Sequence, residues 1–147
     1  MYTRILVATD GSELSQKAVA TAIDLAVACK AELIAFQAVP PYPISYSEGG
    51  IAVDGAEIER IEGVWTASAL AHVRAIAQAA GSKGVKAQAL TKRADVVSNA
   101  VIATAKDHHC DLIVMASHGR RGLSRLLLGS ETQQVLTHAS TAVLVVR

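Results

Sequence analysis

Residues 114–130 read VMASHGRRGLSRLLLGS. This stretch begins as the end of an apolar run typical of a buried strand, continues as a loop rich in glycine and arginine, and ends at Ser130, a residue type that starts helices. Gln133, three residues later, completes a capping-box pattern with Ser130. Because a helix N-terminus has unpaired N–H groups and a partial positive charge, anions bind there. The stretch therefore predicts a backbone cradle for phosphate, with a plain surface loop as the alternative.

The side chains of this loop favour the same interpretation. Three glycines lack a Cβ, so they are free to adopt positive φ and to let a ligand approach the main chain: Gly119, Gly122 and Gly129. Three arginines add mobile positive charge nearby: Arg120, Arg121 and Arg125. Glycine loops are common, however, and the spacing alone leaves both interpretations open.

Outside this stretch, apolar runs alternate with amphipathic stripes along the whole chain. The predicted strands are residues 2–8, 32–39, 85–91, 111–116 and 141–146. The predicted helices begin at Ser12, cover residues 56–80, begin at Asp95 and cover residues 130–138. This βαβαβαβαβ order predicts an open parallel sheet of α/β class with helices on both faces. Ligands of such sheets bind beyond the carboxyl ends of the strands, so Asp10 faces the cradle if the first and fourth strands are neighbours.

Three features between these elements allow more than one interpretation. Residues 40–55 are irregular, with three prolines and three glycines, and form either a connecting loop or a flap over the glycine loop. Trp65 lies on the apolar stripe of its helix and is predicted to be a core residue rather than a ligand platform. His72 shares that stripe and is predicted to be a hydrogen-bonded, half-buried histidine.

Composition limits the class of protein. The 147 residues suit one domain, 1–147, and a net charge of +1 gives no electrostatic case for binding nucleic acid or an anionic membrane. The N-terminus enters a strand pattern directly, so we expect no signal peptide, and no apolar run is long enough to span a bilayer. The cysteines, Cys29 and Cys110, show no disulfide or metal spacing, which favours a reduced, cytoplasmic protein.

Two catalytic or metal-binding interpretations are weak. The run His108 to Asp111 contains metal-ligand residue types, but neighbouring side chains point apart and no second ligand group lies at the required spacing. Ser117, His118 and Asp10 invite a hydrolase triad, yet the nucleophile-elbow pattern is incomplete and adjacent serine and histidine rarely align for proton transfer. The lysine of a phosphate-binding P-loop is missing, which argues against an efficient nucleoside triphosphatase.

The sequence resembles the universal stress proteins in four segments that occur in the family's order. These segments are ILVATDGS at 5–12, DLIVMASHG at 111–119, LLLGS at 126–130 and AVLVV at 142–146. The nucleotide-binding branch of that family carries glycine, two residues, glycine, nine residues, then glycine and serine or threonine. Gly119, Gly129 and Ser130 fit this pattern, whereas Ala116 replaces the first glycine.

The resemblance implies a set of nucleotide-contacting residues. Asp10 would bond the sugar or base, Val39 would wall the adenine, and Gly119, Gly129 and Ser130 would hold phosphates. Glu131 stands where the family usually has a small apolar residue. The full implied set is Thr9, Asp10, Val39, Met115, Ala116, His118, Gly119, Gly129, Ser130, Glu131 and Thr132.

The resemblance also implies the architecture and the assembly. The family fold is a Rossmann-like, adenine nucleotide alpha hydrolase-like open sheet of five parallel strands in the order 3-2-1-4-5. The implied function is a stress-response protein that binds ATP or AMP, with Mg²⁺ accompanying ATP and slow hydrolysis at most. The implied partner is a second copy, joined through residues 142–146, which would otherwise leave an apolar edge exposed. The rival is a dimeric interaction module of the same fold that binds no nucleotide, for which Ala116 and Glu131 are the evidence.

Overall fold

The computed structural model describes residues 1–44, 53–120 and 127–147. Within these residues the chain alternates strands and helices from end to end, as predicted. The strands are β1 (Arg4–Ala8), β2 (Glu32–Val39), β3 (Ala87–Arg93), β4 (Leu112–Ala116) and β5 (Ala142–Val146). The helices are α1 (Glu13–Cys29), α2 (Gly55–Ser82), α3 (Val97–Asp107) and α4 (Ser130–His138).

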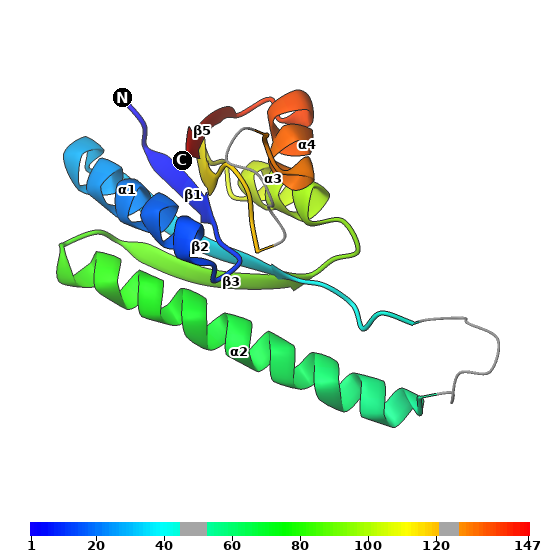
Figure 1. The fold of residues 1–147 in the computed structure, drawn as a ribbon. Helices are drawn as coiled ribbons and strands as arrows, with labels where there is room; N and C mark the ends of the chain where they lie inside the picture. Colours follow the sequence, from blue (N-terminus) through cyan, green and yellow to red (C-terminus); the bar gives the residue numbers. More distant parts are fainter. Residues whose placement is uncertain (45–52, 121–126) are drawn as a thin grey trace.

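The strands form one parallel sheet in the order β3-β2-β1-β4-β5, which confirms the predicted topology. The helices α1 and α2 cover one face, and α3 and α4 cover the other (Figure 1). β1 pairs with β4 through Ile5–Leu112, Leu6–Ile113 and Val7–Val114. The carboxyl ends of these two strands therefore lie side by side, as Asp10 requires in order to face the predicted cradle.

The core divides into two apolar layers because the central strands are covered on both sides. Every residue of β4 is buried, as expected for a strand inside a parallel sheet. Alternate strand residues pack on opposite faces: Ile5 and Val114 face α1 and α2, whereas Leu6 and Ile113 face α3 and α4. β3 is an outer strand in which no residue is fully buried, which confirms its predicted place at the edge.

Two of the predicted helix caps are wrong. Ser12 does cap α1, and its side chain accepts a hydrogen bond from the Ser15 N–H. However, Asp95 does not cap α3, since the capping position is Val96 and makes no side-chain cap bond. Ser130 does not cap α4 either. It is the first helical residue, the cap is Gly129, and the Gln133 N–H bonds the Gly129 carbonyl, so no capping box forms.

Helix α2 extends beyond the sheet at its amino-terminal end (Figure 1). Its fully buried residues begin only at Ala69, although the helix begins at Gly55. Trp65 lies in the protruding part, where it stacks on Tyr42 with ring centroids 6.1 Å apart and is 37% exposed. The prediction of Trp65 as a core residue is wrong because its helical stripe continues past the sheet that would bury it.

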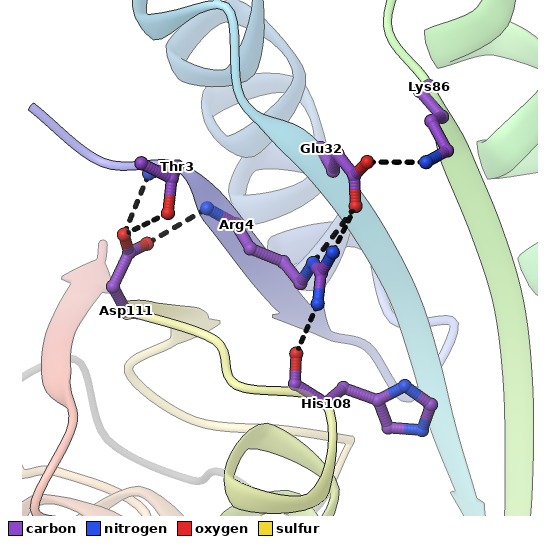
Figure 2. Close-up of polar contacts among 6 residues, drawn as sticks. All are labelled: Thr3, Arg4, Glu32, Lys86, His108 and Asp111. Carbon is purple, nitrogen blue, oxygen red and sulfur yellow. Dashed lines mark hydrogen bonds and ion pairs between the residues drawn. The ribbon is translucent and has the colours of Figure 1, made fainter.

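Polar side chains tie the strand starts together at the amino-terminal edge of the sheet (Figure 2). Arg4 donates to Glu32 through Nε at 2.9 Å and Nη2 at 2.6 Å, and to the His108 carbonyl at 2.9 Å. Lys86 Nζ reaches the other Glu32 oxygen at 2.5 Å. Hydrogen bonds from Lys86 and Arg4 hold the pKa of the Glu32 carboxyl below its usual value. Asp111 accepts from Thr3 at this edge, so the network links β1 with its neighbouring strands.

Replacing Asp111 with asparagine is expected to lower the free energy of unfolding by about 1 kcal/mol at neutral pH, a value reduced for solvent exposure. Asp111 accepts from the N–H groups of Thr3 at 2.8 Å and Arg4 at 3.0 Å. Burial raises the pKa of Asp111, but these bonds lower it overall. A folded-state pKa below the unfolded one stabilises the fold above about pH 4, and this contribution disappears as the pH falls through the folded value.

Urea unfolding of wild type and Asp111→Asn from pH 3 to 7 measures this difference. The gap between the two proteins should close in acid, where the wild-type carboxyl becomes protonated. Asp107→Asn is the matched control, because Asp107 is exposed and lies four residues away at the end of α3. Equal stability of Asp111→Asn and wild type throughout this range would contradict the assigned role of Asp111.

Candidate functional site

The carboxyl ends of β1 and β4 bring together most of the residues that the sequence singled out. Thr9 and Asp10 follow β1, residues 117–120 follow β4, and α4 begins beside them. We call this group the carboxyl-edge site, and it consists of Thr9, Asp10, Met115 to Gly119, and Gly129 to Thr132.

A hydrogen-bonded turn fixes the part of this site that follows β1. Thr9 N donates to the Phe36 carbonyl of β2 at 3.0 Å, and Thr9 Oγ1 lies 2.9 Å from Ser15 Oγ. The same Thr9 oxygen accepts from the Gly11 N–H at 3.2 Å. Gly11 has a φ of 79°, in the left-handed region that favours glycine. The sequence DGS thus places Asp10 on a rigid turn.

Asp10 connects the turn after β1 to the loop after β4. Its Oδ1 accepts from the Ser12 N–H at 2.9 Å, and its Oδ2 accepts from the Arg120 N–H at 2.9 Å. Burial raises the pKa of the Asp10 carboxyl, but hydrogen bonds from Ser12 and Arg120 outweigh this effect and hold the pKa below its ordinary value. Asp10 is therefore ionised near neutral pH.

The Arg120 side chain crosses the same turn. A Cβ built on Gly11 would lie 2.8 Å from Arg120 Nη2 and 3.7 Å from His72 Cε1. His72 is half-buried, and its Nδ1 lies 2.7 Å from Gln37 Oε1, which confirms the prediction for this histidine. Arg120 thus lies over the β1–α1 turn. Arg121, Gly122 and Arg125 lie outside the described residues, as do residues 45–52 of the segment 40–55 that is predicted to be a connecting loop or a flap.

The first turn of α4 is attached to the end of β4. Gly129 N donates to the Ser117 carbonyl at 2.8 Å, and Thr132 Oγ1 donates to the Ala116 carbonyl at 2.9 Å. Thr132 is 3% exposed, so this bond is shielded from water. The first N–H groups of a helix have no partner within the helix. These two bonds therefore hold the N–H groups at the start of α4 at a fixed depth beside β4.

Two glycines in this region are needed for space rather than for positive φ. Gly129 has a φ of −60°, and Gly119 is not among the positive-φ glycines. A Cβ on Gly129 would lie 3.1 Å from His118 Cα, and a Cβ on Gly119 would overlap Asp10 Oδ2. Neither glycine uses the positive φ that a missing Cβ allows. A side chain would instead overlap the Asp10 carboxylate at position 119 and crowd the backbone of Ser117 and His118 at position 129.

The remaining strand residues of the implied set lie on different faces of the sheet. Met115 packs in the layer under α3 and α4, whereas its neighbour Ala116 packs in the layer under α1 and α2. Val39 is 2% exposed at the carboxyl end of β2, two strands away from β4. Strand alternation places Val39 on the same face as Gln37.

The serine and histidine proposed for a triad do contact each other. Ser117 Oγ lies 3.2 Å from His118 Nδ1, which is within hydrogen-bond distance. The two adjacent side chains thus do contact each other, contrary to expectation. Nevertheless, Ser117 is only 6% exposed, and among the described residues no hydrogen bond links Asp10 to His118. The described residues therefore do not form a catalytic triad, in which a carboxylate orients the histidine toward an accessible serine.

One contact in this region was not predicted. Glu131 Oε2 accepts from the backbone N–H of Ser98, at the start of α3, over 2.6 Å. The two residues are 33 positions apart, so no local pattern signals the pairing. The Glu131 carboxylate is thus bonded to a second helix of the same sheet face.

Other parts of the described chain are less suited to a functional site. A concavity of about 210 Å³ lies at the opposite edge, lined by Arg4, Glu32, Lys86 and His108 among others, but its charged groups already pair with one another. Among residues 1–44, 53–120 and 127–147, no three His, Cys, Asp or Glu side chains gather as a metal site. No helix in these ranges is long and apolar enough to cross a membrane.

Comparisons with known proteins agree on one family. The profile of the universal stress protein family matches residues 1–147. Universal stress protein MJ0531 of Methanocaldococcus jannaschii is 33% identical over 152 residues, covering 100% of this chain and 83% of the relative. The structure of universal stress protein UspA from Lactobacillus plantarum has a TM-score of 0.84 at 25% identity, with 99% and 98% of the chains covered. A universal stress protein solved in complex with cAMP has a TM-score of 0.72 at 28% identity, with 99% and 97% covered.

Proposed function

The chain belongs to the universal stress protein family, and we propose that it binds an adenine nucleotide, AMP or ATP, at the carboxyl-edge site. The observation that carries this proposal is the attachment of the α4 start to β4 beside Asp10. Its N–H groups suit a phosphate, and the ionised Asp10 suits a donor such as a ribose hydroxyl or an adenine amino group. The relative that binds cAMP supports the choice of an adenine nucleotide.

In this proposal the implied contact residues divide the ligand between them. Gly119, Gly129 and Ser130 approach the phosphates, and Thr132 and Glu131 complete the first turn of α4. Thr9, Asp10 and Val39 serve the nucleoside, with Met115, Ala116 and His118 beside them. Mg²⁺ would arrive with ATP and be held by its phosphates, since the described residues offer no carboxylate cluster for it.

Calorimetric titration with AMP, and with ATP plus Mg²⁺, tests the proposal. Mass spectrometry of small molecules released from gently purified protein provides an independent measurement. An adenine nucleotide in near-stoichiometric amount, or saturable binding in the micromolar range, is the expected result. Protein that carries no nucleotide and gives no heat with either ligand would contradict the proposal.

The rival function is a stress-response interaction module that binds no nucleotide. It is favoured by Ala116, whose methyl group stands where the nucleotide-binding branch has glycine. We favour binding because Ala116 is 7% exposed and packs with the core layer under α1 and α2. A negative titration would select the rival.

We further propose a cytoplasmic homodimer that acts as a stress regulator, joined through β5. This strand ends the sheet and pairs only with β4 among the described strands, and its apolar residues are mostly half-buried. Pairing of two such edges would cover them. Sedimentation velocity of the purified chain distinguishes a dimer from a monomer.

A further inference from the structure

Glu131 joins two helix starts on one face of the sheet. Its backbone belongs to the first turn of α4, and its carboxylate accepts from Ser98 N in the first turn of α3 at 2.6 Å. Ser98 is 1% exposed. The capping residue of α3, Val96, has no side-chain acceptor for these N–H groups. Glu131 therefore supplies from α4 the cap that the α3 sequence lacks.

This bond decides where the charge of Glu131 acts. A carboxylate is favourable at a helix N-terminus, because the unpaired N–H groups there carry partial positive charge. The short distance to Ser98 N is typical of a charge-assisted hydrogen bond. The negative charge of Glu131 is thus paired with the N-terminus of α3, so the first-turn N–H groups of α4 can bind another anion.

The next residue in the chain ties the same turn in a second direction. Thr132 Oγ1 donates to the Ala116 carbonyl at the end of β4, in a buried bond of 2.9 Å. Glu131 and Thr132 therefore attach the start of α4 both to the strand that precedes the loop and to the neighbouring helix. A turn held from two sides keeps its N–H groups in one orientation.

We propose that Glu131 is a positioning residue for the nucleotide phosphate, acting through its carboxylate bond to the α3 N-terminus. This inference rests on the proposed function. It gives Glu131 the opposite effect from the one that its charge alone predicts. A free carboxylate beside a phosphate would weaken binding, whereas a carboxylate that fixes the α4 turn strengthens it.

Two substitutions separate these effects in the full-length protein. Glu131→Ala removes the bond to Ser98, and AMP affinity is expected to fall about 5- to 10-fold, since a hydrogen bond to a charged group is lost. Glu131→Gln keeps an oxygen that accepts from Ser98, so its affinity should stay within about 3-fold of wild type. Gln134→Ala, on the exposed side of the same helix, is the control and should leave affinity unchanged.

Amide hydrogen exchange of the nucleotide-free protein provides a second readout. In Glu131→Ala, the Ser98 amide and the first-turn amides of α4 should exchange faster, and Glu131→Gln should restore their protection. Tighter AMP binding by both variants would overturn the inference in favour of charge repulsion. Lower stability of Glu131→Ala with unchanged AMP affinity would also overturn it. Wild type that binds neither AMP nor ATP would overturn this inference and the proposed function together. If wild type binds a nucleotide but the variants do not show the expected differences, only this inference is overturned.

Discussion

Gly129→Val is expected to reduce AMP affinity at least about tenfold, because the α4 start would be pushed away from β4. A Cβ at this position lies 3.1 Å from His118 Cα and 3.4 Å from the Ser117 carbonyl oxygen. Both contacts are backbone atoms, which cannot rotate aside. The Gly129 N–H bond to Ser117 O, now 2.8 Å, would be lost or lengthened, and the cradle would lose its orientation.

The effect should be steric and graded. The φ of −60° and ψ of 150° at Gly129 are accessible to any residue, so backbone strain does not contribute. Gly129→Ala should therefore cause a smaller loss than Gly129→Val. Gly63→Val is the matched control, since a Cβ on Gly63 meets nothing within 4 Å. Overpacking at Gly129 should also lower stability by about 1 to 3 kcal/mol.

Calorimetric titrations with AMP and with adenosine show which part of the ligand loses its contacts in Gly129→Val. Gly129→Val should weaken AMP binding more than adenosine binding, because only AMP has the phosphate that the α4 start would hold. Unchanged AMP affinity in a folded Gly129→Val protein would exclude the start of α4 as the phosphate site.

The order of strands and helices and the parallel sheet were predictable because the signals for them are local, whereas the strand order 3-2-1-4-5 came from the resemblance to the family. β4 contains five consecutive apolar residues, Leu112–Ala116, and all five are buried. Glu32–Val39 has the predicted bounds of β2 because Pro40 follows it directly. The alternation of such runs with helices allows few arrangements of a parallel sheet.

The tertiary contacts of the site were not predictable in the same way. The bond from Ser98 to Glu131 joins residues 33 positions apart, and the bond from Arg120 to Asp10 joins residues 110 apart. Both depend on the packing of elements that are distant in sequence. The motif placed Gly119 and Gly129 correctly in the loop, but the reason for glycine at each position is the proximity of Asp10 and His118, which no spacing rule contains.

The helix starts also depend on tertiary contacts that the residue type at the cap does not predict. Ser12 is followed by its helix and caps it, because the next residues form a stripe that packs on the sheet. Ser130 has the same residue type, yet its neighbour Gly129 takes the capping position, since the chain must pass closely by His118 before α4 begins. Local capping preference was therefore overridden by tertiary packing at the candidate site.

Asp10→Ala is expected to weaken the binding of both adenosine and AMP, adenosine by about 5- to 150-fold, which corresponds to about 1 to 3 kcal/mol. Adenosine loses affinity if the carboxylate bonds the nucleoside, and AMP then loses at least as much, because it contains the same nucleoside. The substitution also removes the acceptors of the Ser12 and Arg120 N–H groups, so the turn after β1 and the loop after β4 would separate.

This second consequence makes the comparison of ligands decisive. If Asp10 only holds the Arg120 loop in place, adenosine affinity should stay near the wild-type value and AMP affinity alone should fall. Asp107→Ala, an exposed aspartate at the end of α3, controls for the loss of one negative charge. Thermal unfolding of each variant verifies that the folded protein is being titrated.

The pKa of Asp10 lies below the ordinary aspartate value of about 4. Its carboxylate is therefore charged throughout the interval from about pH 5 to pH 8. The contribution of Asp10 to adenosine affinity should therefore be constant over that interval, and a loss caused by Asp10→Ala that shrinks from pH 8 to pH 5 would show that the ionised Asp10 is not the group that binds the nucleoside.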